Sequence, residues 1–465
     1  MPRWEESGLY RFDATRPRAD VFSIDTPPPT VSGSLHVGHV FSFTHTDVIA
    51  RFQRMRGKAV FYPMGWDDNG LPTERRVQNY YGVRCDPALP YDSQFAPPDK
   101  PGKQPISVSR PNFIELCARL TAEDEKVFEH LWRTLGLSVD WSKTYATIDQ
   151  RSQRVSQLAF LRLLKRGLAY QVEAPTLWDT DFKTAVAQAE LEDRETTGAY
   201  HRIRFGLASS AATAFVEIET TRPELIPACV ALVAHPDDTR YQPLFGQEVV
   251  TPLFGVRVPV RPHPLADPDK GSGIAMICTF GDITDVTWWR ELSLPVRAVN
   301  QADGTLRPVT WGAPGWESID SDRAARYYEG LVRLSAAKAR VKIVEALRES
   351  QDLIGDPRPI THSVKFYEKG DRPLEIVTSR QWFFKTVEFR EALIARGRAL
   401  AWHPAYMQAR FENWANGLNG DWCVSRQRFF GVPFPVWYPL DAEGRVQYER
   451  PIGARESRRG ARRIW

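Results

Sequence analysis

Two histidines three residues apart are the strongest candidates for chemistry in this chain. His36 and His39 directly follow a proline- and glycine-rich turn over residues 27–33. The apolar residues 21–24 before that turn predict a buried strand, and the apolar spacing through 40–52 predicts a helix of about five turns. Unpaired N–H groups and the dipole at a helix start attract anions, and two imidazoles there can donate hydrogen bonds to a triphosphate. The pattern therefore predicts a phosphate site, with Gly38 allowing a flat base to approach the backbone.

A carboxylate follows the next predicted strand. Residues 60–63 are apolar and end near Gly65, and Asp67 stands two residues later in a segment that runs to Glu74. An open parallel sheet places its ligand crevice at the carboxyl ends of its strands, so Asp67 is expected to face a pocket. The alternative interpretation is an acidic turn in solvent.

The composition is that of an ordinary soluble protein. The 465 residues are 42% apolar and 25% charged with a net charge of +4, which excludes a disordered or membrane class. No apolar run approaches the length of a spanning helix, so we expect a cytoplasmic protein without a membrane partner. The cysteines form no Cys-x-x-Cys pair, so we expect neither disulfides nor structural zinc, and no metal site of the protein's own. They are Cys85, Cys117, Cys229, Cys278 and Cys423.

The pattern of predicted strands and helices changes along the chain. Strands and helices alternate up to about residue 194, which favours a parallel sheet with helices on both faces. Short β-rich runs then continue to about residue 360 with a helical stretch over 323–348, and mixed α/β character returns over 361–440. This order predicts one domain inserted into another. Residues 441–465 form a basic tail rich in arginine.

The segment from Pro27 to His39 resembles the His-Ile-Gly-His signature of class I aminoacyl-tRNA synthetases, and its proline run is similar to that of the valine-specific members. The resemblance implies an α/β fold, a Rossmann-like parallel-sheet catalytic domain split by an inserted β-rich editing domain. It also implies that ATP, accompanied by Mg²⁺, activates valine, and that tRNA(Val) accepts the valine. Under this resemblance His36 and His39 are charge-assisted donors to the phosphates and act neither as nucleophiles nor as metal ligands.

Three further residues receive roles from the resemblance. Asp67 would bind the α-ammonium group of valine, because a buried ammonium requires an ionised carboxylate. Trp422, in a family-like segment over 421–428, would form an apolar wall of the valine pocket together with Pro28. Thr30 stands where the family usually has asparagine.

Two segments of the inserted region resemble the editing domain that the valine, isoleucine and leucine enzymes share. Threonine is nearly isosteric with valine, and an apolar pocket rejects it only about 10²-fold, a value known for valine enzymes themselves, so a second hydrolytic site is expected. By resemblance, Asp285 would hold the amino group of the misattached residue and Asp282 would help to recognise the threonine hydroxyl. Thr220, Thr221 and Arg222 would hold the tRNA terminus. The chain departs from the bacterial pattern at Met276, Cys278 and Gly281.

Several alternatives stay open at this point. The motif-level resemblance is followed to about Tyr438, so we expect a truncated or frame-shifted end before the Lys-Met-Ser-Lys-Ser loop and a ligase-impaired fragment. Within the ligase class, an isoleucine or leucine synthetase fragment is the alternative. From other classes, the chain could be a stand-alone aminoacyl-tRNA editing hydrolase, or a passive RNA-binding fragment that uses its basic end.

Overall fold

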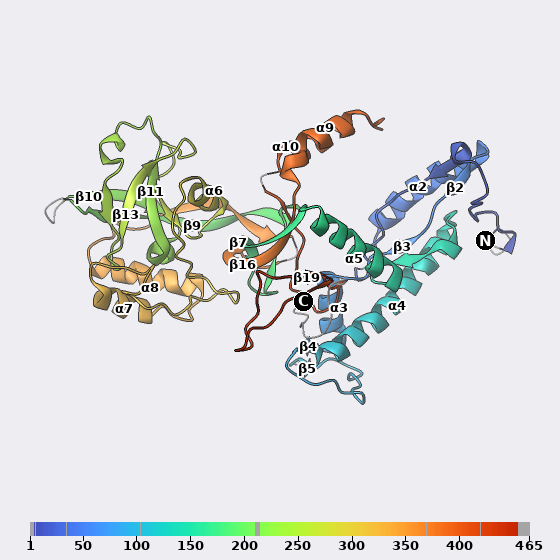
Figure 1. The fold of residues 1–465 in the computed structure, drawn as a ribbon, viewed down its shortest axis with the longest axis horizontal. Coiled ribbons are helices and arrows are strands. Elements are labelled where there is room, and N and C mark those ends of the chain that lie inside the picture. The colour runs from blue at the N-terminus through green and yellow to red at the C-terminus, as the bar shows by residue number, and fades with distance from the viewer. Residues whose placement is uncertain are drawn as a thin grey trace. The chain divides into compact units, whose positions relative to one another are not determined.

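The computed structural model describes residues 4, 6–33, 35–102, 104–209, 214–368, 370–418 and 420–453. The chain forms two compact units (Figure 1). Unit 1 comprises Met1–Leu168 and Arg428–Trp465, and unit 2 comprises Ala169–Gln427. The sequence of unit 2 therefore interrupts that of unit 1. The expected domain limits near residues 194 and 360 fall within two paired strands of unit 2, Leu191–Leu207 and Arg358–Tyr367.

Unit 1 has short strands and long helices, as the alternating pattern predicted. Its elements are η1 (Arg18–Asp20), β1 (Val21–Ser23), α2 (Val37–Met55), β2 (Ala59–Phe61), β3 (Gly65–Trp66), α3 (Leu71–Tyr81), β4 (Val83–Cys85), β5 (Ile106–Val108), α4 (Arg110–Leu135), η2 (Trp141–Lys143), β6 (Tyr145–Ala146), α5 (Gln150–Lys165), β18 (Val436–Trp437) and β19 (Ile452–Gly453).

The segment 59–67 lies between two other segments that run parallel to it. β1 pairs with β2, and β6 pairs with β3. Successive residues of an extended chain direct their backbone groups to opposite sides. The carbonyls of Phe61 and Asp67 therefore accept hydrogen bonds from N–H groups within residues 24–31. Those of Tyr62 and Trp66 accept from N–H groups within residues 140–147, on the other side. The segment is therefore the middle strand of a small parallel arrangement, and Asp67 lies at its carboxyl end.

Helices α2 and α4 supply the apolar side chains that cover this arrangement. Phe43 and Ala50 of α2 are buried, and the Phe43 ring lies 4.8 Å from the Trp132 ring of α4 between centroids. The same cluster contains Val60, Tyr62, Met64 and Trp66 of the middle segment. This packing fixes the start of α2 relative to the strand ends.

A buried carboxylate joins the two sequence segments of unit 1. Glu74 of α3 accepts hydrogen bonds at Oε1 from the backbone N–H groups of Phe429 and Phe430, at 2.7 and 2.9 Å. Burial raises the pKa of Glu74, whereas the charge of Arg428 and these two hydrogen bonds lower it in part. The returning segment is thus held where the chain re-enters unit 1.

Unit 2 contains the β-rich region. Its elements are β7 (Ala169–Asp179), β8 (Thr184–Ala185), η3 (Gln188–Glu190), β9 (Leu191–Leu207), β10 (Phe215–Thr220), η4 (Pro223–Ala228), β11 (Cys229–Ala234), η5 (Gln242–Leu244), β12 (Glu248–Val250), β13 (Arg257–Pro262), β14 (Ile274–Cys278), α6 (Ile283–Glu291), α7 (Ser321–Glu329), α8 (Ala336–Glu349), β15 (Arg358–Tyr367), β16 (Glu375–Phe384), η6 (Val387–Phe389), α9 (Arg390–Arg398), α10 (Met407–Asn416) and β17 (Trp422–Cys423).

Two sheets organise unit 2. A seven-stranded sheet has the order β10-β9-β12-β13-β11-β14 with β15 paired to β9, and a four-stranded sheet has the order β17-β16-β7-β8. The β-rich runs predicted between residues 195 and 360 include β10, β11 and β13. The helical stretch expected over 323–348 is two helices, α7 and α8, because Gly330 ends the first and Ser335 precedes the second.

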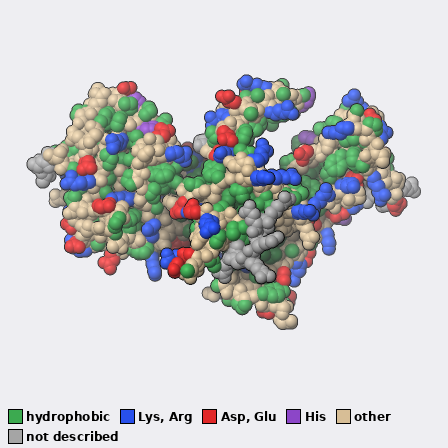
Figure 2. All heavy atoms as spheres, in the orientation of Figure 1, with side chains coloured by type: hydrophobic (Ala, Val, Ile, Leu, Met, Phe, Trp, Pro, Cys, Tyr) green, Lys and Arg blue, Asp and Glu red, His purple; other side chains and the backbone are tan. Residues whose placement is uncertain are grey.

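The surface carries both signs of charge. Figure 2 shows acidic and basic side chains interspersed on the visible face, in keeping with the small net charge of +4. Among the described residues, no helix is long and apolar enough to cross a membrane. The predicted basic tail lies outside the described residues from residue 454 onward.

Replacing Glu74 tests how the returning segment is held. We expect Glu74→Ala to lower the free energy of unfolding of unit 1 by about 2 kcal/mol or more, because two buried N–H groups lose their acceptor. Glu74→Gln keeps an oxygen at that position and should cost clearly less. Urea unfolding, with limited proteolysis of residues 428–453, measures the difference. Equal losses for the two variants would contradict this assignment.

Candidate functional sites

The histidine pair caps the N-terminus of α2. His36 is the N-cap residue, and its Nδ1 accepts a hydrogen bond from the Gly38 N–H at 3.1 Å. The Nδ1 atom of His39 accepts from the His36 N–H at 3.4 Å, and the two ring centroids lie 4.0 Å apart. Because Nδ1 is an acceptor in both rings, each neutral ring carries its hydrogen on Nε2. The helix start therefore offers two Nε2–H donors.

The surroundings of His39 favour a neutral imidazole. Burial lowers the pKa of His39, and the charge of His36 lowers it further. The His39 ring also packs edge-on against Phe128 of α4, with centroids 5.5 Å apart. Neutral rings that donate through Nε2 suit a phosphate at the positive end of a helix, where the backbone already supplies favourable charge.

Gly38 is required by the cap itself. A Cβ atom at this position would lie 2.9 Å from Nδ1 of His36, closer than real Cβ contacts. Any side chain at residue 38 would therefore displace the imidazole from the helix start. This gives the glycine a role in addition to the predicted approach of a base, which stays a prediction.

Asp67 is held by two threonine hydroxyls. Thr30 Oγ1 lies 3.2 Å from Asp67 Oδ2, and Thr147 Oγ1 lies 3.1 Å from Asp67 Oδ1. Thr147 Oγ1 also accepts hydrogen bonds from the Asp68 N–H and from the Asn69 side-chain amide. Since the hydroxyl has a single hydrogen, that hydrogen is left to donate to Asp67. The carboxylate is thus fixed by a donor on each oxygen.

These contacts follow from the strand arrangement. Thr30 forms a parallel bridge with Asp67, and Thr147 follows β6 on the other side of the middle strand. From the sequence, Thr30 was identified only as a departure from the family pattern, and Thr147 was not identified at all. No strand was predicted before Thr147, so the sequence offered no signal for its role.

The neighbouring carboxyl group has a different environment. Asp68 is buried, and this burial raises its pKa well above the usual range, with the nearby Glu125 carboxylate raising it further. Asp68 is therefore held in its neutral form near pH 7, whereas Asp67 receives hydroxyl donors that favour a carboxylate. The two adjacent aspartates therefore lie in different surroundings.

Tyr145 closes over the backbone beside Asp67. A Cβ atom at Gly65 would lie 2.3 Å from Cζ of the Tyr145 ring, so only glycine fits beneath it. Burial raises the pKa of Tyr145, and the charges of Asp25 and Asp67 raise it further. The aromatic ring and the carboxylate therefore belong to one small neighbourhood.

Unit 1 contains four of the predicted site residues other than Gly38. Asp67 directly follows β3, His36 and His39 are at the start of α2, and half-buried Pro28 lies two residues before Thr30. Trp422 belongs to unit 2, in β17, where its side chain is exposed and its ring contacts Phe384. The predicted valine wall made of Pro28 and Trp422 stays a prediction.

Arg222 lies within an ion network in unit 2. Its guanidinium donates to Glu224 at 3.0 Å, to Glu375 at 2.8 Å and to the Gly281 carbonyl at 3.1 Å. Glu224 is fully buried and also pairs with Arg340 at 2.8 Å. Although burial raises the pKa of Glu224, the hydrogen bond from Arg340 and the charge of Arg222 hold it below its ordinary value. All three guanidinium nitrogens of Arg222 therefore have acceptors inside the protein.

The two predicted aspartates form the start of α6. Asp282 is the N-cap residue and accepts from the Asp285 N–H at 2.9 Å, and Asp285 Oδ2 accepts from the Gly281 N–H at 2.8 Å. Burial raises the pKa of Asp285 well above its ordinary value, and the Asp282 carboxylate raises it further. An arriving ammonium group would favour ionisation of this carboxyl.

The departures from the bacterial editing pattern have structural reasons. A Cβ atom at Gly281 would lie 2.7 Å from Asp285 Oδ2, so a side chain there would push the carboxyl group away. Met276 and Cys278 belong to the main apolar cluster of unit 2. Thr220 Oγ1 accepts from the Arg222 N–H at 3.0 Å. The hydrogen bond from the Arg222 guanidinium to the Gly281 carbonyl joins the two predicted segments.

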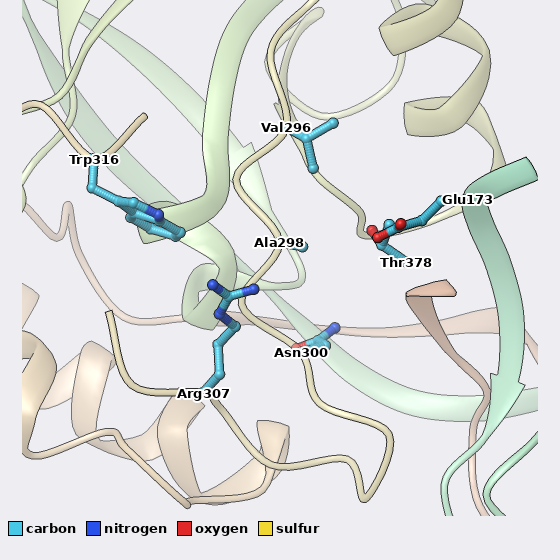
Figure 3. Close-up of a pocket in the computed structure, with 7 residues that line it drawn as sticks. All are labelled: Glu173, Val296, Ala298, Asn300, Arg307, Trp316 and Thr378. Carbon is cyan, nitrogen blue, oxygen red and sulfur yellow. The ribbon is translucent and has the colours of Figure 1, made fainter. Parts of the chain in front are cut away.

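Unit 2 also has a small cavity that contains none of the predicted site residues. Its volume is about 230 Å³, and Figure 3 shows Arg307 and Trp316 on one side with Glu173 and Thr378 on the other. Asn300 lines it and also donates to Glu375, the acid that binds Arg222. Within the described part of the chain, no group of three or more His, Cys, Asp or Glu side chains is placed to hold a metal ion.

Comparisons with known proteins bear on these sites. A sequence model of the class I tRNA synthetases for isoleucine, leucine, methionine and valine matches residues 1–459. The valine–tRNA ligase of Thermobifida fusca (strain YX) is 64% identical over 459 residues, which are 98% of this chain and 51% of that protein. The valine–tRNA ligase of Leifsonia xyli subsp. xyli (strain CTCB07) is 63% identical over 97% of this chain and 53% of its own length.

The chain spans about half the length of the curated relatives it matches. A solved structure also matches, the ternary complex of Agrobacterium radiobacter K84 agnB2 LeuRS with tRNA and LeuAMS, at 18% identity and a TM-score of 0.40, over 97% of this chain and 51% of that one. The family match continues to residue 459, past the point near Tyr438 to which the motif-level resemblance was followed. The chain belongs to the class I tRNA synthetases of the isoleucine, leucine, methionine and valine group.

Proposed function

We propose that this chain is the valine- and ATP-binding part of a valine–tRNA ligase. The observation that carries the proposal is the Asp67 carboxylate, fixed by Thr30 and Thr147 at the end of the middle strand, in the same unit as the histidine-capped helix. A fixed anion suits the α-ammonium group of an amino acid, and a helix start with added donors suits a phosphate. The sequence identity of this chain to the valine–tRNA ligases of two organisms supports valine as the amino acid.

The proposed reaction activates valine and then transfers it. The valine carboxylate attacks the α-phosphorus of ATP in line, pyrophosphate leaves, and the terminal ribose hydroxyl of tRNA(Val) displaces AMP from the aminoacyl adenylate. Asp67 would orient the amino acid, and His36 and His39 would donate through Nε2 to phosphate oxygens as negative charge shifts toward pyrophosphate. Magnesium would enter with ATP and neutralise part of the phosphate charge. Translation in the cytoplasm is the setting that these substrates imply.

Selection of valine rests on apolar contacts with its side chain. Pro28 and Trp422 would contact the isopropyl group, and one methylene in such a pocket changes affinity by about 1–3 kcal/mol. An isoleucine or leucine enzyme would use the same ammonium and phosphate contacts. The two alternatives differ in which aminoacyl adenylate binds best.

A non-hydrolysable adenylate analogue tests the proposal without requiring turnover. We expect the chain to bind valyl-sulfamoyl-adenosine more tightly than the leucyl and isoleucyl analogues in isothermal titration calorimetry. Asp67→Asn should weaken the valyl analogue about 10- to 100-fold, because the ammonium loses a charge-assisted partner.

The exposed carboxylate of Asp20 supplies a matched control. Asp20→Asn removes one negative charge, as Asp67→Asn does, but at a residue away from the carboxyl ends of the strands. This variant should bind like the unmodified chain. Tighter binding of the isoleucyl or leucyl analogue would contradict valine, and equal binding by Asp67→Asn would contradict the ammonium role.

Unit 2 supports a second activity, hydrolysis of threonyl-tRNA(Val). The buried Asp285 carboxyl and the Asp282 cap lie beside the Thr220–Arg222 segment. We propose that Asp285 binds the amino group of the misattached threonine, that Asp282 contributes to recognising its hydroxyl, and that Thr220 and Thr221 contact the tRNA terminus. Arg222 would act from within its ion network, by positioning the Gly281 carbonyl and any tRNA atom that reaches its remaining N–H groups.

Deacylation of threonyl-tRNA(Val) in the absence of ATP tests this activity. We expect hydrolysis above the rate in buffer, and a loss of at least about tenfold in Asp285→Asn, which keeps the Gly281 contact but cannot carry the charge. Valyl-tRNA(Val) serves as the substrate control and should be hydrolysed more slowly. Binding of the tRNA without any hydrolysis would instead support a passive RNA-binding fragment.

A further inference from the structure

Helix α5 of unit 1 carries a row of basic side chains along one side. The members of this row, which we call the α5 basic row, are all exposed: Arg151, Arg154, Arg162 and Lys165. Each residue of a helix advances by about 100°, so these four positions lie within about 80° of one another around the helix axis. At a rise of about 1.5 Å per residue the row is about 21 Å long.

The protein supplies no opposite charge to this row. No acidic residue occurs between residues 150 and 168. Within the described part of the chain, none of the four side chains forms a hydrogen bond or an ion pair. Asp149, just before the helix, uses its two carboxylate oxygens to accept from the backbone N–H groups of Ser152 and Ala146. By contrast, Arg51 of α2 pairs with Asp47 at 2.6 Å.

The stability of the helix does not explain the row. Arg162 and Lys165 lie in the last turn, where the helix dipole favours cations. Arg151 lies in the first turn, where the same dipole disfavours them, and Arg154 follows it closely. Like charges three residues apart also repel each other on a helix surface. The first half of the row therefore costs the helix stability, and it requires another reason.

The other side of α5 is occupied by protein. The Phe160 ring lies 4.9 Å from the Phe434 ring between centroids, and Gln157 donates to the Pro433 carbonyl at 2.9 Å. The segment 428–453 thus covers the apolar side of the helix and leaves the basic side uncovered. Figure 2 shows Lys and Arg side chains gathered over the region where Figure 1 places α5.

We propose that the α5 basic row binds the sugar–phosphate backbone of tRNA. A row of cations without acidic partners is complementary to a row of phosphates, and its binding releases the counterions that surround RNA. Contacts of this kind position a nucleic acid without reading its sequence. The inference rests on the proposed function, in which tRNA accepts the amino acid, and it adds the surface of unit 1 that holds the RNA.

An anionic membrane fits the row less well. A helix that lies on a membrane inserts a broad apolar face between the lipids. The apolar side of α5 is already covered by the segment 428–453. In α5, which the structure describes throughout, Val155 is the one large apolar side chain that is exposed, at 60%. The surface of the helix therefore offers charge without an apolar face.

The salt dependence of tRNA binding tests the row. Fluorescence anisotropy of labelled tRNA(Val) with the whole chain would give the association constant at a series of salt concentrations. Replacing Arg151, Arg154 and Arg162 together by glutamine keeps long side chains that favour a helix. We expect this variant to reduce the slope of log K against log salt by about 2–3, because three phosphate contacts are lost. An unchanged slope, or no tRNA binding by the unmodified chain, would overturn the proposal.

The loss of affinity is expected to be independent of the RNA sequence. The glutamine variant should weaken tRNA(Val) and an unrelated tRNA by the same factor, about tenfold or more at low salt, since phosphate contacts carry no sequence information. A loss confined to tRNA(Val) would contradict a backbone contact.

Two matched variants separate a local surface from the net charge of the protein. Replacing the same three arginines by lysine keeps the charges and should keep the slope. Replacing Arg326, Arg333 and Lys338 by glutamine also removes three exposed charges, in and between helices α7 and α8, which carry acidic residues as well. This variant should change the slope clearly less. A loss in either matched variant equal to that of the first would contradict the assignment to α5.

Two further measurements keep this inference apart from the proposed function. The glutamine variant of α5 should bind valyl-sulfamoyl-adenosine like the unmodified chain, because none of its changed residues belongs to the proposed amino-acid or phosphate sites. Loss of the analogue in this variant would show a general effect and overturn the assignment. Vesicles of phosphatidylserine test the other occupant. Binding of vesicles that the variant loses, without binding of tRNA, would identify a membrane in place of RNA.

Discussion

The orientation of the Asp67 carboxylate is the constraint on which the rest of unit 1 depends. Thr30 and Thr147 approach its two oxygens from neighbouring parallel strands, so the carboxylate is set by strand register. A slip of one residue would turn Asp67 to the other face. The apolar packing of α2 and α4 against the middle strand holds that register, and the histidine cap begins one of these two helices. Fold and site are therefore fixed by the same contacts.

In unit 2, ion pairs take the place of hydroxyl groups in positioning a carboxyl group. Glu224, without exposure to solvent, is shared by Arg222 and Arg340, and Glu375 binds Arg222 from β16. Removing one member of such a network leaves an uncompensated buried charge, which typically costs about 3–5 kcal/mol. The network holds the Gly281 carbonyl, and the Gly281 N–H in turn holds Asp285. Positioning of the aspartates at α6 thus depends on residues far away in sequence.

Much of the fold and part of the candidate sites were predictable from the sequence, and the reasons differ by residue. The strand before His36, the helix after it and the β-rich runs of unit 2 follow local periodicity, which the sequence displays directly. Thr147 could not be found, because its role arises from strand pairing across 80 residues. The acceptors of Arg222 were equally hidden, since Glu375 and Gly281 lie far along the chain. The position of Gly38 was predicted, whereas its contact with the His36 ring depends on side-chain geometry.

The affinity of the chain for valine in a Thr147→Val variant tests the central claim most directly. Valine has nearly the shape of threonine but cannot donate to Asp67, so calorimetry should show about tenfold weaker binding of free valine, with Thr147→Ser close to the unmodified chain. Circular dichroism would verify that both variants are folded. Unchanged affinity in Thr147→Val, or an equal loss in Thr147→Ser, would contradict the account that a fixed Asp67 binds the amino acid.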